Sequence, residues 1–350
     1  MRFHFLWAAA ALLLNACGTG QFDENSLPDA VGSPGELVVV CDDAVWLGES
    51  GDQIRKTYGA EQPGLPQAEP WFKLIRFDEG KFNSVTRKYR SILLITTLDN
   101  DSKTSRYIQE LLGEKKYSEQ LTDSTFLFVE GTNRWAKGQQ VMYLIGQNDK
   151  ALARAVKRKK DELLNYLNAR ELNRLVAAIK LKGRNSKAEK VVADSCGIQL
   201  FLPKSYQVRV AEKDFVWLAR EDDEKVLNLL VHRRPYNSTS QFEAARVLAY
   251  KDSLTQARIP GPTEGSYYTT EYLFPPDTTV TSFDGQYALK LRGLWRVEND
   301  FMGGPFIHTT GVDAPSGKLI MIEGFVYYPK EKKRELLREL EAIMASAQRK

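Results

Sequence analysis

The chain has 350 residues, with 49 lysines and arginines against 45 aspartates and glutamates and a formal net charge of +4. A balance this close to neutral argues against a general nucleic-acid-binding protein, which usually carries a strong basic excess. Hydrophobic residues make up 43% and aromatic residues 11% of the chain, enough for packed cores, and the length favours two domains.

The first seventeen residues have the pattern of a secretory signal. Arg2 provides a basic start, Phe5–Leu14 is an apolar run, and residues 14–17 read Leu-Asn-Ala-Cys. The apolar run is too short to span a bilayer, so we predict a cleaved signal peptide over residues 1–16. The segment that ends at Cys17 resembles the lipobox of bacterial lipoproteins. This resemblance implies cleavage before Cys17 and attachment of fatty-acyl chains such as palmitate to that cysteine.

Lipidation would make the mature protein a folded body on a membrane tether, because two or more acyl chains anchor stably. Residues 17–35 are rich in Gly, Asp, Asn, Ser and Pro, and we predict that they form this tether. Asp23 and Glu24 partly match the acidic export signal of some surface lipoproteins of Bacteroidota. We therefore expect a cell-envelope protein, in the outer rather than the inner membrane, with the membrane face left open. The alternative is an ordinary secretory signal with Cys17 as a bystander.

Cleavage removes Arg2 and leaves 334 residues with a net charge of +3. Besides Cys17, the mature chain holds Cys41 and Cys196, which could pair in an oxidising compartment. Cys41 directly follows the apolar run Leu37–Val40, which is typical of a buried unpaired cysteine. The sequence therefore favours two free, buried thiols over a disulfide.

Residues 36–182 alternate strand and helix patterns, which predicts an α/β layer domain that ends in a long helix. We expect strands at 36–41, 71–77, 89–98, 125–130 and 140–145, and helices at 47–58, 104–115 and 149–181. The last of these reads as one helix or as two in line. It carries a basic cluster that is typical of a solvated face, with contact to anionic lipid or a partner as the alternative. The cluster comprises Arg154, Lys157, Arg158, Lys159 and Lys160.

A polar stretch at residues 183–190 predicts a linker, and residues 191–350 predict an α+β domain with an antiparallel sheet. We expect strands at 197–203, 215–220, 226–232, 267–274, 286–298, 306–312 and 318–327, and helices at 241–254 and 330–347. The apolar strand that ends in Leu202-Pro203, followed by Tyr206, resembles the opening strand of PsbP/Mog1-type domains. That resemblance implies the same sandwich of sheet and helices, and it carries no function.

Familiar catalytic motifs are missing: the sequence has no HExxH, GxSxG, GxxxxGK[ST] or GxGxxG. After cleavage only His232 and His308 remain, in different expected strands, so we predict no metal site and no cofactor. His308 follows Gly303-Gly304-Pro305 and could serve as a general base or simply be structural.

Two stretches combine Gly and Pro with aromatic and charged residues: 259–271 and 292–306. Such a composition is typical either of a structural corner, with an arginine paired to a carboxylate, or of a binding surface. The remaining alternative is catalysis by paired acids. The candidate binding residues are Glu264, Tyr267, Arg292, Trp295 and Asp300. The paired acids would be Glu264 and Asp300.

Five features together are similar to lipoproteins of Bacteroidota that carry domains of unknown function. They are the lipobox, the 36–41 strand leading to Trp46 and Gly48, and the stretches IPGPTEGSYY, RGLWRVENDFMGGPF and IEGFVYYPKEKKRELLRELEAI. The resemblance spans nearly the whole mature chain and implies an envelope lipoprotein without an established activity.

The sequence-based hypothesis is a lipid-anchored, non-enzymatic binding or scaffolding module for an envelope protein, peptide or glycan. The alternatives are an envelope hydrolase that uses carboxylates and a small-ligand carrier. The carrier hypothesis predicts a cavity between the layers of a domain.

Overall fold

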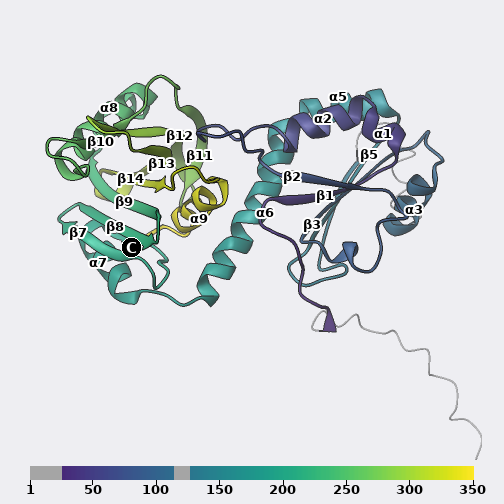
Figure 1. Ribbon diagram of the computed structural model, residues 1–350, viewed down its shortest axis with the longest axis horizontal. Helices are drawn as coiled ribbons and strands as arrows, with labels where there is room; N and C mark the ends of the chain where they lie inside the picture. Colours follow the sequence, from purple (N-terminus) through teal and green to yellow (C-terminus); the bar gives the residue numbers. More distant parts are fainter. Residues whose placement is uncertain (1–25, 114–126) are drawn as a thin grey trace, which may run out of the picture.

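The computed structural model describes residues 26–113 and 127–350, which form two domains of sheets and helices (Figure 1). The predicted fold class, α/β and α+β layers with an antiparallel sheet in the second domain, is confirmed. The signal peptide, Cys17 and the first part of the tether lie outside the described residues. Within residues 26–113 and 127–350, no helix has the length and apolar character needed to cross a membrane.

The first domain is built on a five-stranded sheet in the order β2-β1-β3-β5-β4 (Figure 1). Its members are β1 (Glu36–Val40), β2 (Lys73–Phe77), β3 (Ser91–Thr97), β4 (Leu127–Thr132) and β5 (Gln140–Gly146). All neighbouring pairs are parallel except β4 and β5. The central strands read as continuous apolar runs because helices cover both faces of the sheet.

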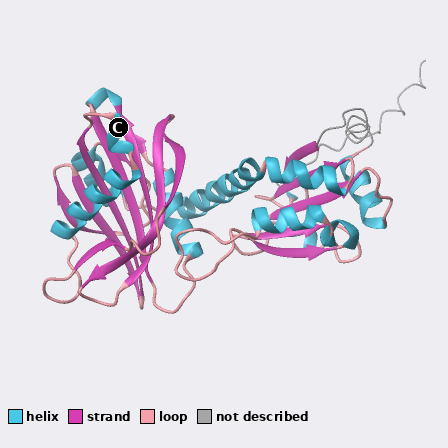
Figure 2. Ribbon diagram, turned by 90° about the horizontal axis from the view of Figure 1, so that it is seen from above, coloured by secondary structure: helices cyan, strands magenta, loops and turns pink. Residues whose placement is uncertain are grey.

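Helices on one face of this sheet are α1 (Asp43–Leu47), α2 (Glu49–Tyr58), α5 (Asp149–Arg158) and α6 (Lys160–Leu181). The opposite face carries α3 (Lys103–Leu112). The expected helix at 149–181 is thus two helices that meet at Lys159. The first half of α6 packs in the core of the first domain, and its second half packs against the core of the second. This helix accordingly bridges the two domains (Figure 2).

Two segments expected to be free of structure are partly ordered. Within the predicted tether, Lys137 donates its backbone N–H to the Pro28 carbonyl over 2.8 Å, and Ala30 donates to Lys137 over 3.0 Å. Most of the predicted linker belongs to α7 (Ser186–Cys196), whose N-terminus is capped by the Asn185 side chain. The segment at Pro28 and Ala30 therefore packs on the first domain, and the connection between α6 and α7 is only a few residues long.

The second domain is built on one antiparallel sheet in the order β10-β12-β13-β14-β9-β8-β7. β11 also pairs with β12, along residues 286–292, whereas β10 pairs with residues 295–298 of that strand. Its members are β7 (Gln207–Glu212), β8 (Phe215–Asp222), β9 (Lys225–Pro235), β10 (Tyr267–Thr270), β11 (Asp277–Phe283), β12 (Gln286–Glu298), β13 (Gly303–Asp313) and β14 (Lys318–Tyr327). Two short strands, β6 (Ile198–Gln199) and β15 (Gln348–Arg349), pair with each other. β7, β11 and β15 were not predicted from the sequence.

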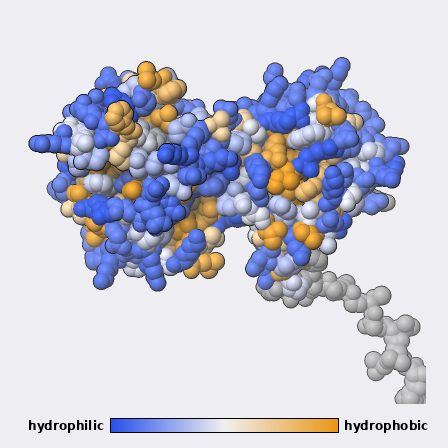
Figure 3. Space-filling model, in the orientation of Figure 1, coloured by the Kyte–Doolittle hydropathy of each residue, from blue (hydrophilic) through white to orange (hydrophobic). Residues whose placement is uncertain are grey.

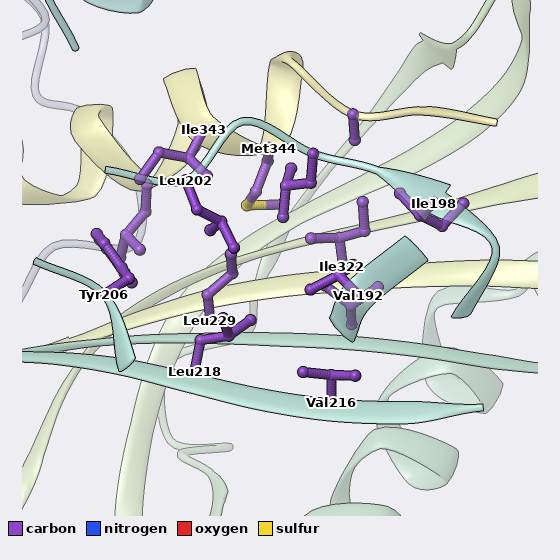
Figure 4. Packing of buried hydrophobic residues seen from close by; sticks show 14 of the residues in the cluster. Val192, Ile198, Leu202, Tyr206, Val216, Leu218, Leu229, Ile322, Ile343 and Met344 are labelled. Atoms are coloured by element: carbon purple, nitrogen blue, oxygen red, sulfur yellow. The ribbon is translucent and has the colours of Figure 1, made fainter. Parts of the chain in front are cut away.

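Helices cover both faces of the second sheet. One face packs on α8 (Ala244–Arg258), and the other packs on α7 and α9 (Arg334–Ala345). Figure 4 shows Met344 and Ile343 of α9 directed toward the strands that carry Ile322 and Leu229. Cys41 and Cys196 lie in the cores of different domains and are both unpaired, as the sequence favoured.

The domains meet a second time through the segment 59–72, which connects α2 to β2. The buried carboxylate of Glu69 accepts the backbone N–H groups of Lys333 over 2.7 Å and of Arg334 over 3.2 Å. These two groups begin α9, and Lys333 at the N-cap makes no side-chain cap of its own. A glutamate of the first domain therefore caps a helix of the second.

The guanidinium groups of α9 complete this contact between the domains. Arg334 donates to the Pro70 carbonyl over 2.7 Å, and the buried Arg338 donates to the Trp71 carbonyl. The Arg338 guanidinium also lies over the Phe72 ring, 4.8 Å from its centroid. Charged side chains are almost never this deeply buried without partners, and here the first domain supplies them.

Candidate functional site

The five residues predicted as a binding site do not come together. Arg292 and Trp295 are both on β12, but they are three residues apart, and side chains alternate between the faces of a strand. Arg292 therefore faces α9, whereas Trp295 faces α8. The odd spacing of these two residues was visible in the sequence and already separates them.

Arg292 is paired to a carboxylate, as the structural-corner interpretation expected. Its Nη2 lies 2.5 Å from Glu341 Oε2, and its guanidinium lies 5.3 Å from the centroid of the Trp71 ring. Only 4% of the residue is exposed. The side chain thus links β12, α9 and the segment 59–72 of the first domain.

Trp295 belongs to an aromatic cluster in the core under α8. Its indole Nε1 donates to the Val326 carbonyl over 3.2 Å, and its ring stacks on Tyr268 with centroids 5.3 Å apart. The ring also meets Phe325 edge-on at 5.5 Å. Since Trp295 is 3% exposed, its contribution is to the packing of this core.

The other three predicted residues lie at the loop end of β10 and β12. Glu264 is exposed in the turn before β10, and Tyr267 is half-buried at the start of that strand. Asp300 accepts a hydrogen bond from the Thr263 hydroxyl over 3.4 Å and from the Phe301 backbone over 2.6 Å. Glu264 and Asp300 thus lie on neighbouring loops that face solvent, away from Arg292.

A pocket of about 170 Å³ lies between α9 and the sheet, close to the bridging helix α6. Apolar walls come from Leu172, Phe283, Ile307, Ile322, Met344, Ala345 and Ala347. Polar groups come from Thr281, Ser282, Asp284, Lys290, Thr309 and Glu341. We call this the junction pocket, because both domains contribute to its wall.

Two cations share one carboxylate beside the junction pocket. Lys290 Nζ lies 2.8 Å from Glu341 Oε1, and Arg292 holds the other oxygen of the same carboxylate. Burial raises the pKa of Glu341, but the charges of Arg292 and Lys290 outweigh it and lower that pKa to about 2. Glu341 is therefore ionised near neutral pH and leaves one positive charge uncompensated.

Sequence reasoning missed Lys290 and Glu341, although both carry a readable signal. Glu341 lies in the apolar stripe of α9, four residues after Leu337 and three before Met344. Lys290 and Arg292 alternate with leucines along β12, which places both cations on one face. A charged residue at a position that the pattern assigns to the core indicates a buried ion pair.

A second polar cluster lies under α8 and includes His308, the candidate general base. Glu323 accepts from the Tyr268 hydroxyl over 2.6 Å and lies 2.8 Å from His308 Nδ1. Lys251 Nζ lies 3.8 Å from the same carboxylate and 4.4 Å from the centroid of the Tyr268 ring. Lys251, His308 and Glu323 are each at most 3% exposed, so this cluster is enclosed by the fold.

Neither cluster is arranged as a metal centre. In the two described ranges, no group of three or more His, Cys, Asp or Glu side chains could hold a metal ion. A second cavity of about 260 Å³ lies near the end of α6, where Arg220 pairs with both Glu339 and Asp222. Because Arg220 already pairs with two carboxylates, it is not available to bind an anion in this cavity.

Among solved structures, the chain is similar to a mutant of the protein Mog1, with 12% identity, a TM-score of 0.29, and coverage of 43% of this chain and 90% of that one. It is also similar to LpqN, described as involved in cell envelope biogenesis of Mycobacterium tuberculosis, with 13% identity and a TM-score of 0.27. That match covers 43% of this chain and 82% of LpqN. No curated protein matches the chain by sequence.

Two family models match along the chain, and each is described as a domain of unknown function. DUF8532 matches residues 30–180, and DUF4837 matches residues 185–346. Their boundary falls at the end of α6, where the first domain of the structure gives way to the second. Residues 30–180 are thus similar to one domain of unknown function and residues 185–346 to another, in the same order as the two domains of the structure.

Proposed function

We propose that this protein is a lipid-anchored binding protein of the cell envelope, and that it binds an extended segment of a partner polypeptide along β11. The observation that carries this proposal is the open edge of β11. The strand pairs with β12 on one side, and no other strand of the described chain pairs with it. An unpaired edge presents a row of backbone N–H and C=O groups whose natural partner is another extended backbone.

The composition of β11 leaves this edge open to pairing. Its sequence is Asp-Thr-Thr-Val-Thr-Ser-Phe, with one charge at the first position and no proline. Val280, at the centre, is 70% exposed. Threonine and valine favour the extended conformation, so the strand needs little rearrangement to accept a neighbour.

The opposite edge of the same sheet is protected, which makes the contrast informative. On β7 the pairing shifts at a bulge between Val208 and Val210, and the strand carries Arg209 and Glu212. Bulges and charges are the usual devices that keep an edge strand from pairing with another chain. Since β11 has no bulge and a single charge, at its first residue Asp277, its open edge fits a binding role.

Exposed apolar residues are concentrated in the stretch of sequence that contains β11. Of the ten large hydrophobic residues that are exposed in the described chain, five lie between positions 272 and 287. They are Tyr272, Leu273, Phe274, Val280 and Tyr287. The face of the molecule drawn in Figure 3 is largely hydrophilic, with groups of hydrophobic residues on both domains. A partner segment with apolar side chains at alternate positions would bury this group while its backbone pairs with β11.

The lipid anchor is supported by the sequence around Cys17 and by its short distance from the first domain along the chain. Ten residues separate Cys17 from Pro28, whose carbonyl accepts the backbone N–H of Lys137 in the first domain. This arrangement suits a folded body held near a membrane. Incorporation of labelled palmitate into the wild type, and its loss in Cys17→Ser, would test the anchor separately from the binding edge.

The binding edge is tested by site-specific photocrosslinking in the membrane-anchored protein, followed by binding of the captured segment as a synthetic peptide. The crosslinker replaces Val280 or, as a matched control, Val85. Val85 is a valine of similar exposure, 66% against 70%, and lies in the first domain. We expect a polypeptide adduct at position 280 alone. The peptide should slow hydrogen exchange along residues 277–283, and Val280→Lys should weaken its binding at least tenfold.

Three results would overturn the proposal. The first is crosslinking at position 280 only to a second copy of this chain, which would make the edge a self-association surface. The second is capture of lipid or glycan without polypeptide. The third is a captured peptide that binds the Val280→Lys variant as tightly as the wild type and leaves exchange in β11 unchanged.

A further inference from the structure

We infer that the junction pocket binds a small monocarboxylate that carries an apolar ring or branched chain. The carboxylate would lie on Lys290 and Thr309, and the apolar part would lie against Phe283 and Met344. The pocket takes one wall from β11 (Thr281, Ser282 and Phe283), but the inference does not depend on a partner at the open edge of that strand. It rests on the charge, the free donors and the size of the pocket.

The first argument is charge. Lys290 and Arg292 both pair with Glu341, and Asp284 at the rim pairs with Arg349 over 2.6 Å. Three cations therefore face two carboxylates, and the site holds one surplus positive charge. A carboxylate neutralises that charge, whereas a phosphate monoester with two charges would leave a negative charge beside the buried Glu341 carboxylate.

The second argument is the set of unused donors. The Lys290 ammonium has three N–H donors, and its contact with Glu341 is its single polar partner among the described residues. Thr309 lies directly opposite Lys290 on the neighbouring strand, so the two side chains share one face at close spacing. The hydroxyls of Thr309 and Thr281 have no hydrogen-bond partner in the part of the chain that the structure describes. An ammonium beside a free hydroxyl suits the two oxygens of a carboxylate.

The third argument is size and wall chemistry. A pocket of about 170 Å³ compares with the roughly 150 Å³ engineered cavity that accepts benzene. Phe283, Ile307, Ile322 and Met344 supply an apolar wall beside the cation. The pocket thus combines a charged end and an apolar end, which is the chemistry of a short branched-chain or aromatic carboxylate.

The probe for this inference is benzoate, added to the mature chain with Cys17→Ser so that the protein stays in solution. Binding is followed by titration calorimetry and by the methyl resonances of labelled methionine. Met344 lines the pocket, whereas Met142 lies in the core of the first domain and serves as an internal reference. We expect saturable binding at one site that shifts the Met344 signal and leaves the Met142 signal in place.

Two comparisons decide whether Lys290 provides the charged end. Lys290→Met keeps the apolar stem and leaves Arg292 on Glu341, and it should weaken benzoate binding at least tenfold. Lys318→Met is the matched control, because Lys318 is also a half-buried, ion-paired lysine on this sheet but lies outside the pocket. Benzyl alcohol, which has the same ring without the charge, should bind at least tenfold more weakly to the wild type.

The inference is overturned if benzoate binding does not saturate, if Met344 does not respond, or if benzyl alcohol binds as tightly as benzoate. Equal weakening by Lys290→Met and Lys318→Met also overturns it. Should Lys290→Met fail to fold, the comparison of benzoate with benzyl alcohol on the wild type still decides. None of these results bears on crosslinking at Val280, so failure here leaves the proposed binding edge standing.

Discussion

Replacing Glu69 by alanine tests whether the first domain caps α9. The substitution removes an acceptor shared by the N–H groups of Lys333 and Arg334, in a site where Glu69 is 4% exposed. Loss of an N-cap costs about 0.5–2 kcal/mol. Leaving a buried N–H without a partner costs roughly 1–3 kcal/mol. These costs overlap, so we expect the free energy of unfolding to fall by about 2–3 kcal/mol.

The measurement is urea unfolding of the mature chain with Cys17→Ser, followed by circular dichroism and tryptophan fluorescence. Glu69→Gln keeps one neutral acceptor and should lose about half as much stability. Glu61→Ala is the control, because Glu61 is exposed in the same segment and should change stability by less than about 0.5 kcal/mol. If Glu69→Ala is no worse than Glu61→Ala, the cap between domains does not stabilise the protein.

The remaining predictions concern a buried acid, two thiols and an aromatic core. The pKa of Glu341 is lowered from 4.5 to about 2, so its contribution of about 3 kcal/mol is present above pH 4.5 and disappears as the pH falls to about 2. Urea unfolding across that range should show a steeper loss for the wild type than for Glu341→Gln, and equal slopes would contradict this. Burial raises the pKa of Cys41 and Cys196 to about 12, so both should resist Ellman's reagent at pH 8 until urea is added. A rapidly reacting thiol in the native mature Cys17→Ser chain would refute this. Trp295→Ala should cost about 3–5 kcal/mol of unfolding free energy, and a loss below about 1 kcal/mol would show that the cluster is not tightly packed.

Most of the fold follows from hydrophobic patterning along the chain. Continuous apolar runs such as β3 and β5 were predicted because a parallel strand buried on both faces needs apolar residues throughout. The strand β11 was missed because an exposed edge strand has little apolar alternation to detect. The dipeptide Asp284-Gly285 that follows it does carry the signal: both residues have positive φ, 50° and 76°, as a tight hairpin turn requires.

The candidate site was harder to predict, because it depends on which residues the fold brings together. Arg292 and its pairing with a carboxylate were anticipated, but its partner Glu341 lies 49 positions away in another element. Nothing local in the sequence identifies that partner. Strand periodicity does separate Arg292 from Trp295, so the face of each residue was predictable even where its contacts were not.

The cap on α9 makes the start of this helix depend on a residue of the other domain. Lysine is a poor N-cap residue, and the cap is supplied instead by the carboxylate of Glu69, 264 residues earlier in the chain. The residue that caps the last helix therefore belongs to the first domain. A chain that carried the second domain alone would need an aspartate, serine or threonine at position 333 to begin this helix equally well. We accordingly expect related chains with both domains to keep Lys333 together with Glu69. Related chains with the second domain alone should carry a capping residue at position 333.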